Sequence, residues 1–388
     1  MVYDFDKIID RKHTNCIKYD FTEEFHRPSD VMPLWVADMD FQAPEEVREA
    51  LKRAAEHGIY GYTDTKKDYN DTVIRWFEEG FSWKPEAEWM IKMPGVVFAL
   101  AMAVQALTRP GEGVLIQPPV YHPFSASVEN NGRKLVENPL IYKDGKYEMD
   151  FEDFENKIRD NAVKLFILCS PHNPVGRVWK KEELMRVGEI CQKYGVIVVS
   201  DEIHCDFTFE GHEHTVYASL GEAFASHAII CTAPSKTFNI AGLQASNIFI
   251  PNPEIRSAVK QAMTATGYSS LNQMGIYAAQ AAYTYGRPWL EALKKYLAEN
   301  VSLVREFLKR EMPEVRLVEP EGTYLIWLDF SGLGFSDDEL NKRIQERAGL
   351  WLNRGTMFGA EGAGFQRVNI ACPKKILKEA LERLKNIR

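Results

Sequence analysis

The sequence has no long apolar run. Hydrophobic residues make up 45% of its 388 residues, but polar side chains interrupt every stretch before it reaches the ~20 residues that a membrane-spanning helix needs. The first residues, Met-Val-Tyr-Asp-Phe-Asp-Lys, mix charged and apolar side chains and do not form the apolar core of a secretory signal. We therefore expect a cytoplasmic protein that does not enter a membrane.

Cysteine is sparse and scattered. The chain has six cysteines, none in a Cys-x-x-Cys pair, and three of them lie in or beside apolar, strand-like runs. This distribution is typical of reduced thiols inside a protein and not of a disulfide framework or a metal site. We therefore expect no bound metal. The cysteines are Cys16, Cys169, Cys191, Cys205, Cys231 and Cys372.

Dense positive charge is also missing. The net charge is −8 and no block of Lys and Arg appears, which argues against a nucleic-acid surface. Internal repeats and low-complexity tracts are absent from the sequence as well. A chain of this length can bury a large core and is expected to form two domains. A globular enzyme or binding protein is the resulting expectation.

Strand and helix patterns alternate over residues 90–250, which predicts βαβ units and a mostly parallel sheet. From residue 273 to 311 the pattern is helical, long enough for a spine between domains. Beyond residue 311, the pattern of strands and helices predicts a smaller α+β domain. We expect strands at 315–318, 323–328 and 367–371, helices at 337–348 and 374–385, and a mobile glycine-rich loop at 353–366. The predicted division is an N-terminal arm (1–45), a large domain (46–285) and a small domain (286–388).

A lysine follows one of the most apolar strands. Residues 228–242 begin as an Ile-rich strand, and Pro234 ends it because proline has no N–H to donate. Lys236 then lies at the rim of the sheet, where open α/β folds place their chemistry. Desolvation there lowers the pKa of a lysine and makes it a nucleophile toward aldehydes. For a single lysine, the ordinary alternative is a solvated loop residue.

Two further stretches offer binding features. Gly95, Val96 and Val97 open an alanine-rich apolar helix, whose free N–H groups and dipole can hold a phosphate. An ordinary glycine-capped helix is the alternative. Tyr121 lies in a proline-rich loop after another strand and forms a rigid platform for a flat ring, or else a hydrophobic plug.

Two polar residues follow the next strands. Asn173 lies in Pro-His-Asn-Pro-Val-Gly and is either a turn residue or an amide donor to a ligand. Asp201 comes directly after the run 196–200 and either pairs with a buried cation or caps a helix. The segment 33–41 mixes apolar and acidic residues, and it is either a packing arm or the lining of a cleft.

Together these groups match the needs of pyridoxal phosphate. Its aldehyde takes a lysine, its ring nitrogen takes a carboxylate, and protonation of that nitrogen makes the ring an electron sink. Its phenolic oxygen takes an amide donor, its face takes an aromatic side chain, and its phosphate takes a helix start. The sequence supplies each of these groups at a strand end or helix start within one predicted sheet.

The chain resembles the fold-type I pyridoxal-phosphate enzymes of the class I/II aminotransferase superfamily, and within them the cystathionine β-lyase/cystalysin (MalY/PatB) group of C–S lyases. The resemblance covers nearly the whole chain. It implies an α/β fold, with a large domain built on a mostly parallel seven-stranded sheet and a smaller α+β domain. It rests on Trp35-Val-Ala-Asp-Met-Asp-Phe, Tyr60-Gly-Tyr-Thr, Gly95-Val-Val, Pro119-Val-Tyr, Ser170-Pro-His-Asn-Pro-Val-Gly-Arg-Val-Trp, Asp201-Glu-Ile-His, Ala233-Pro-Ser-Lys-Thr-Phe-Asn-Ile-Ala-Gly and Gly322-Thr-Tyr-Leu.

The resemblance also implies a role for each site residue. Lys236 would carry the cofactor and shuttle protons, with Tyr121 stacked on the ring. Arg367 would bind the substrate carboxylate as a bidentate fork, although a surface strand arginine is the alternative from the sequence. The other implied cofactor contacts are Asp201, His204, Asn173, Gly95, Val96, Val97, Ser235 and, from the neighbouring subunit of a homodimer, Tyr62. The other implied substrate contacts are Asn173, Ala37 and Tyr324.

Three positions depart from the wider pattern. Many aminotransferases place a serine three residues before the lysine and an arginine eight after it, both on the phosphate; here those residues are Ala233 and Gln244. The phosphate is then expected to rely on the helix start, Ser235 and Tyr62. His122 stands where cystalysin has a second tyrosine. It either replaces that phenol in proton transfer or packs.

The implied reaction is α,β-elimination. A cysteine S-conjugate or cystathionine would be converted to a thiol, pyruvate and ammonia. The alternative is transamination by the same residues, and a less favoured one is a regulatory protein that uses the fold to bind a partner. The intact Lys236 and Asp201 argue against a role in binding alone.

Overall fold

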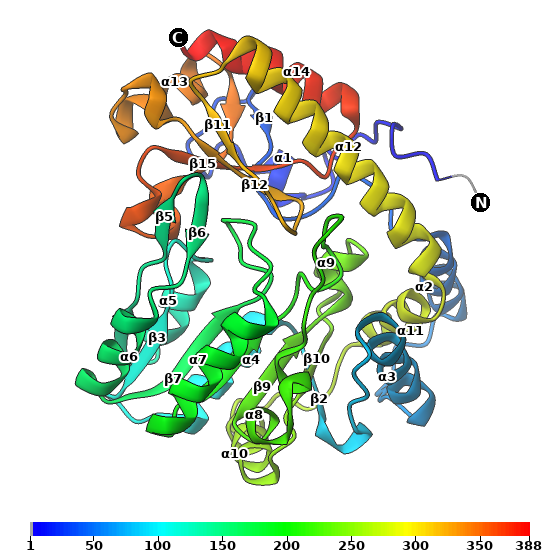
Figure 1. The fold of residues 1–388 in the computed structure, drawn as a ribbon. Helices are drawn as coiled ribbons and strands as arrows, with labels where there is room; N and C mark the ends of the chain where they lie inside the picture. Colours follow the sequence, from blue (N-terminus) through cyan, green and yellow to red (C-terminus); the bar gives the residue numbers. More distant parts are fainter. Residues whose placement is uncertain (1–2) are drawn as a thin grey trace.

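A seven-stranded sheet forms the centre of the larger part of the molecule in the computed structural model, which describes residues 3–388 (Figure 1). Its strand order is β2-β10-β9-β8-β7-β3-β4, and β10 alone runs antiparallel to its neighbours. The predicted mostly parallel sheet is confirmed. The strands are β2 (Met90–Met93), β3 (Gly113–Ile116), β4 (Lys134–Glu137), β7 (Val163–Cys169), β8 (Ile197–Asp201), β9 (Ala228–Thr232) and β10 (Ser246–Phe249).

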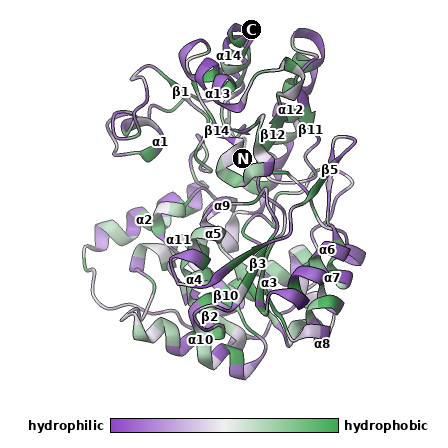
Figure 2. Ribbon diagram, turned by 90° about the vertical axis from the view of Figure 1, so that its left-hand side faces the viewer, coloured by the Kyte–Doolittle hydropathy of each residue, from purple (hydrophilic) through white to green (hydrophobic). Residues whose placement is uncertain are grey.

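Both faces of this sheet are covered, which explains its apolar strands. Along β7, Leu165 and Ile167 face one core cluster with α4, α5 and α10, while Phe166 and Leu168 face the other with α6 and α7. This alternation follows the two-residue period of a strand. In Figure 2 the outer helices carry both hydrophobic and hydrophilic residues. These helices are α4 (Val96–Leu107), α5 (Pro123–Glu129), α6 (Phe151–Asp160), α7 (Lys181–Tyr194) and α10 (Pro253–Ala265).

The C-terminal part contains a separate four-stranded antiparallel sheet, ordered β11-β12-β15-β14. The three strands predicted there begin and end within two residues of the observed ones. The strands are β11 (Arg316–Val318), β12 (Leu325–Asp329), β14 (Asn353–Arg354) and β15 (Phe365–Asn369), and the helices are α13 (Asp337–Glu346) and α14 (Lys374–Leu384).

The predicted helical spine at 273–311 is two helices, α11 (Gln273–Tyr285) and α12 (Arg287–Glu311), which meet at Gly286. Pro288 in the first turn of α12 has no N–H to continue the hydrogen-bond ladder of α11. Gly286 also lies so close to the Phe238 ring that a side chain there would collide with it. From this junction α12 runs along the C-terminal sheet to α14 (Figure 1).

The segment predicted as a mobile glycine-rich loop at 353–366 contains short regular elements. The segment starts in β14, continues through two 3-10 turns, η5 (Gly355–Phe358) and η6 (Ala360–Gly362), and enters β15 at Phe365. Gly355 and Gly362 lie back to back, and a Cβ on either residue would collide with the carbonyl group of the other. The glycines therefore permit a close approach of two backbones.

The N-terminal arm contains the short helix α1 (Ile17–Asp20) and the strand β1 (Met32–Pro33), which pairs in parallel with β13 (Leu350–Trp351). This pairing supports our proposal that the arm (1–45, of which 1–2 lie outside the described residues) associates with the small domain (286–388), beside the large domain (46–285). No helix within residues 3–388 combines the length and apolarity needed to cross a bilayer.

The remaining elements complete the chain. They are α2 (Glu45–His57), α3 (Lys67–Phe81), α8 (Glu222–Ala225), α9 (Pro234–Thr237), β5 (Ile141–Lys143), β6 (Lys146–Glu148), η1 (Ala87–Trp89), η2 (Tyr217–Leu220), η3 (Ala241–Leu243), η4 (Ser331–Leu333) and η7 (Lys385–Ile387).

Candidate active site

The functional loops leave the large sheet at one edge. Asp201 at the end of β8 is in register with Cys169 at the end of β7 and with Cys231 in β9. Because these strands are parallel, their carboxyl ends and the loops that follow them meet at the same edge. β2 and β3 run in the same direction, so the start of α4 and the loop carrying Tyr121 lie there too.

A cavity of about 190 Å³ opens at this edge. Ten of the thirteen predicted site residues line it, although they come from segments up to 199 positions apart. Cys169, Ile203, Ala241, Gln244 and Ala245 also contribute. The predicted residues in the lining are Ala37, Gly95, Val96, Val97, Tyr121, Asn173, Asp201, His204, Ser235 and Lys236.

Lys236 lies in the one-turn helix α9, directly after β9 and Pro234. Its Nζ donates a hydrogen bond to the carbonyl oxygen of Ala37 at 2.8 Å. The pKa of Lys236 is lowered to about 8, chiefly by desolvation and in part by the charge of Arg367, while Asp38 and Asp201 oppose the shift. The residue is therefore a poised amine in a cavity and not a solvated loop lysine.

Asp201 and His204 face the same cavity. Asp201 accepts a hydrogen bond from the Ile203 N–H at 3.1 Å, and among residues 3–388 no cation lies within ion-pair distance of its carboxylate. Desolvation raises the pKa of Asp201 to about 7, and the charge of Glu202 adds to the shift. Desolvation lowers the pKa of His204 to about 3, so its imidazole is neutral. No helix follows Asp201 directly, so the capping alternative is wrong.

Arg367 is buried in the middle of β15, with 5% of its surface exposed, so the surface alternative is wrong. It donates to three neutral acceptors: Asn173 Oδ1 (2.9 Å), the Trp35 carbonyl (2.9 Å) and Asn353 Oδ1 (2.5 Å). Its Nε has no partner in the described chain. Desolvation lowers the pKa of Arg367 to about 10. A buried guanidinium without a carboxylate partner is suited to an anionic ligand.

The turn that carries Asn173 is held by its own backbone. The His172 N–H donates to Arg177 and the Gly176 N–H donates to His172, with Gly176 at φ +75°. The amide oxygen of Asn173 accepts from Arg367. Its NH₂ group is therefore the part of the side chain that remains as a donor to a ligand.

The N-terminal end of α4 lines the cavity. Ala99 is the first residue of this helix whose N–H bonds back, to Gly95, so the preceding N–H groups are free for a ligand. Ser235 and Gln244 line the cavity as well, and Lys236 is the only Lys or Arg among the lining residues. An anion at this end is therefore bound mainly by backbone N–H groups and hydroxyls.

Three predicted residues do not line the cavity. Arg367 lies behind Asn173, as described. Tyr324 is buried and donates from its hydroxyl to the Ala37 carbonyl at 3.0 Å. Tyr62 is fully exposed in the connection between α2 and α3. His122 is exposed and packs beside Tyr121 with 5.3 Å between ring centroids, outside the cavity lining.

Sequence reasoning missed Asn353, whose amide oxygen supports Arg367. It stands at the start of the glycine-rich segment and carries no periodic signal of its own. Its role depends on the antiparallel register that places Asn353 opposite Arg367 in β14 and β15. No local signal in the sequence marks Asn353, because that register is set by the tertiary structure.

This fold and site define a class, and the chain belongs to it: the aminotransferase class I and II family, whose model matches residues 29–384. The predicted fold type and family are confirmed. Among individual proteins, the chain is 48% identical to cystathionine beta-lyase PatB of Bacillus subtilis over 98% of both chains.

Solved structures agree with this comparison. A PLP-bound putative aminotransferase from Clostridium difficile superposes with a TM-score of 0.97 at 43% identity, over the full length of both chains. Cystalysin from Treponema denticola, which contains pyridoxal 5′-phosphate, superposes with a TM-score of 0.96 at 39% identity, covering 100% of this chain and 99% of its own.

Proposed function

We propose that this protein is a pyridoxal-phosphate-dependent C–S lyase of the cystathionine β-lyase type. It converts cystathionine or another cysteine S-conjugate to a thiol, pyruvate and ammonia. The observation that carries the proposal is the cavity itself, where a low-pKa lysine, a buried unpaired carboxylate and a helix start converge. The match to PatB along almost the whole chain supports the choice of reaction.

The residues fit the cofactor group by group. Lys236 would take the aldehyde, and Asp201, which has no cationic partner among residues 3–388, would face a protonated ring nitrogen. Asn173 would donate to the phenolic oxygen and Tyr121 would cover the ring face. The first N–H groups of α4, with Ser235, would hold the phosphate. When bound, the cofactor supplies an aldehyde for amines and a ring that accepts the electrons released as the Cα proton leaves.

The protein's own residues perform the remaining tasks. Arg367 binds the α-carboxylate of the substrate and orients it. Lys236 Nζ takes the proton from Cα, and its pKa of about 8 leaves about a tenth of the amine uncharged at pH 7, far more than an ordinary lysine has. Asp201 holds a positive charge on the ring nitrogen by remaining ionised beside it.

Two measurements on the purified holoenzyme test this function. Borohydride should fix a pyridoxyl group on Lys236, detectable by peptide mass spectrometry, and cystathionine should release pyruvate and a thiol. If no adduct forms, the proposal that Lys236 carries pyridoxal phosphate is wrong. An adduct without pyruvate release would leave the cofactor and reject the lyase reaction.

Transamination is the second candidate, because a neighbour of 43% identity is described as a putative aminotransferase. Both reactions begin with proton removal at Cα, so the same residues serve either one. Incubation with an amino donor and a 2-oxoacid separates them. Exchange of the amino group at a rate exceeding pyruvate release from cystathionine would favour transamination.

We further propose that the enzyme works in the cytoplasm as a homodimer in which Tyr62 reaches the phosphate in the partner subunit. The full exposure of Tyr62, together with that of Ile59 and Tyr60 beside it, supports this proposal. Exposed aromatic residues clustered on one connection are typical of interaction surfaces.

Mixed dimers test the shared site. Lys236→Ala subunits and Tyr62→Ala subunits are each expected to be impaired as homodimers. A heterodimer of the two should regain one intact site, because the lysine of one subunit meets the tyrosine of the other. Co-expression with two affinity tags and a pyruvate assay measure the recovery. If Tyr62 served its own subunit, no site in the heterodimer would be intact and no activity would return.

Asp201→Asn is expected to raise the thermal stability of the cofactor-free protein at pH 8. The carboxyl pKa rises from 3.8 to about 7 on folding, so burial of its charge costs on the order of 4 kcal/mol above pH 7. The cost is absent below the unfolded pKa and grows as pH rises toward the folded one.

Asparagine avoids this cost because it carries no charge. Thermal unfolding at pH 5 and pH 8 should therefore show a larger gain at pH 8. With pyridoxal phosphate bound, the order should reverse, because an uncharged amide in place of the carboxylate cannot neutralise a cationic ring nitrogen. A wild-type protein that is the more stable without cofactor at pH 8 would contradict the expectation.

A further inference from the structure

The segment Trp35–Phe41, here called the strap, has no regular structure, yet side chains hold nearly all of its carbonyl groups. Each carbonyl from Trp35 to Met39 accepts at least one side-chain hydrogen bond, and so does that of Phe41. Buried backbone carbonyls need partners, but here the partners are side chains from distant segments. The position of the strap is therefore set by the elements that carry those side chains.

Two asparagines donate four of the eight side-chain hydrogen bonds to these carbonyls. Asn239 donates to the carbonyls of Met39 (2.9 Å) and Phe41 (2.8 Å) and accepts from the Met39 N–H (2.9 Å). Asn369 donates to the carbonyls of Val36 and Asp38, both at 2.6 Å. The two therefore hold the strap on either side of Ala37.

Each asparagine lies within three residues of a cation of the active site. Asn239 follows Lys236 by three residues in the same loop, at φ +56°, a left-handed conformation that asparagine tolerates. Asn369 follows Arg367 by two residues in β15, so both side chains lie on the same face of that strand. Any shift of the Lys236 loop or of β15 is thus transmitted to Ala37.

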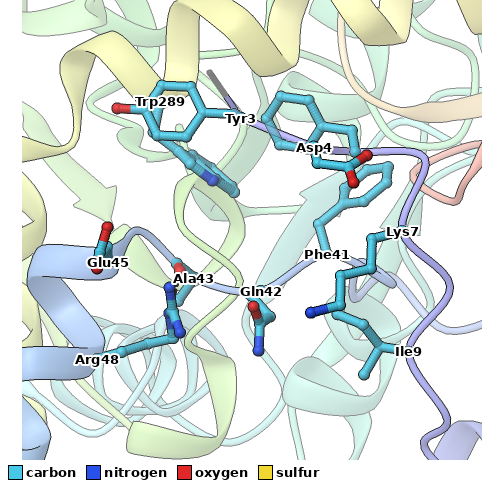
Figure 3. A pocket seen from close by; sticks show the side chains of 11 residues that line it. Tyr3, Asp4, Lys7, Ile9, Phe41, Gln42, Ala43, Glu45, Arg48 and Trp289 are labelled. Carbon is cyan, nitrogen blue, oxygen red and sulfur yellow. Dashed lines mark hydrogen bonds between the residues drawn. The ribbon is translucent and has the colours of Figure 1, made fainter. Parts of the chain in front are cut away.

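Ion pairs and aromatic packing fix the strap further. Arg11 contacts Asp38 (2.5 Å) and Asp40 (2.7 Å), and the fully buried Lys18 contacts Asp40 at 2.9 Å. At its end, Phe41 packs edge-on against Phe5 with 5.1 Å between centroids. Figure 3 shows Phe41 on the wall of a separate cavity of about 450 Å³, near Tyr3 and Trp289.

The carbonyl at the centre of the strap is the one that contacts catalytic groups. Ala37 accepts from Lys236 Nζ at 2.8 Å and from the Tyr324 hydroxyl at 3.0 Å. We propose that the Ala37 carbonyl is a dock for the free amine of Lys236, and that Asn239 and Asn369 are positioning residues that hold this dock in place. The proposal rests on the proposed function of Lys236 as the carrier of the Cα proton.

The dock restricts the amine. With one N–H bound to a fixed carbonyl, the terminal amine loses most of its rotational freedom, and its lone pair is presented in few directions. Restricting the direction of a catalytic base contributes to rate through orientation and not through substrate affinity. Loss of the dock should therefore lower kcat more than it raises KM.

Three full-length variants test the proposal. Asn239→Gly removes three hydrogen bonds and keeps the left-handed backbone conformation accessible. Asn369→Leu replaces the amide that binds the Val36 and Asp38 carbonyls with an isosteric apolar side chain. Asn252→Gly is the matched control, because Asn252 also makes three such hydrogen bonds, in the cap of α10 and to Ser226. Thermal unfolding is recorded for all three.

Two readouts are taken. In holoenzyme assays with cystathionine, kcat should fall about 10- to 100-fold in Asn239→Gly and Asn369→Leu with KM within about threefold. The double variant should lose less than the product of the two single losses, because both act on one carbonyl. In the cofactor-free chain, acetic anhydride should acylate Lys236 about fivefold faster in both variants than in wild type and the control.

An unchanged acylation rate of Lys236 in both variants would overturn the proposal, as would a loss confined to KM. Losses that multiply in the double variant would also overturn it, because the asparagines would then act independently. If Asn239→Gly does not fold, Asn369→Leu alone decides through the same readouts. Failure of the proposed function is separately visible as a lack of borohydride-fixed cofactor in wild type, whereas the acylation readout needs no cofactor.

Discussion

Replacement of Lys236 by alanine will lower the rate of pyruvate release from cystathionine by on the order of 10⁴-fold or more. The side chain is the one amine in the lining of the cavity, and its pKa of about 8 suits both bond formation with an aldehyde and removal of a proton. Alanine can perform neither task. Steady-state assays, together with circular dichroism to verify the fold, measure the effect.

Lys92→Ala is the matched control. Burial also lowers the pKa of Lys92, but that side chain lies over the ring of Tyr69 and not in the cavity. Its removal should leave the rate within about threefold of wild type. Addition of a small primary amine should restore part of the activity of Lys236→Ala and none to the control. A Lys236→Ala enzyme that turns over at the wild-type rate would remove this residue from the chemistry.

Arg367→Leu should lower kcat/KM for cystathionine by about 150- to 5,000-fold, the equivalent of the 3–5 kcal/mol lost when one partner of a buried ion pair is removed. The guanidinium is buried and bound only to neutral acceptors, so a substrate carboxylate is the partner that balances its charge. Arg367→Lys should recover little, because an ammonium group cannot make the bidentate contact.

Arg354→Leu is the control for this change. Arg354 also lies in the small sheet, but it is partly exposed and already paired with Asp337 and Asp338. Its loss should alter kcat/KM by less than about threefold. A cysteamine S-conjugate lacks the α-carboxylate, so the wild-type enzyme should convert it slowly. Arg367→Leu should convert it at the same slow rate. A further loss with that substrate would show that Arg367 supports the fold of the site instead of the carboxylate.

Much of the large domain was predictable because its signals are local. Apolar runs of strand length alternated with helical patterns, and in a parallel sheet the ends of such strands meet at one edge. Asn173, Asp201 and Lys236 each follow a strand directly, so their convergence required only the assumption of a parallel sheet. The helix after Gly95 was visible for the same reason.

The sequence did not show where a glycine permits a close approach to another part of the chain. The glycine-rich segment 353–366 contains 3-10 turns because Gly355 and Gly362 lie in contact, and the helical segment 273–311 is divided in two where Gly286 meets the Phe238 ring. A glycine-rich segment has the same local pattern whether it moves freely or packs tightly. Only the neighbour across the contact distinguishes the two cases.

The sequence by itself determined which residues lie at the ends of the buried strands, because apolar runs of strand length can be recognised in it directly. Tertiary structure alone decided what meets them. The Ala37 carbonyl accepts a hydrogen bond from the Lys236 amine, and the Asn353 amide oxygen accepts one from Arg367. Each contact joins two different segments of the chain, and nothing in the sequence shows that these segments meet. Such contacts depend on how the two sheets and the N-terminal arm pack together. That packing results from the burial of side chains throughout the molecule, and it produces no local periodic pattern in the sequence.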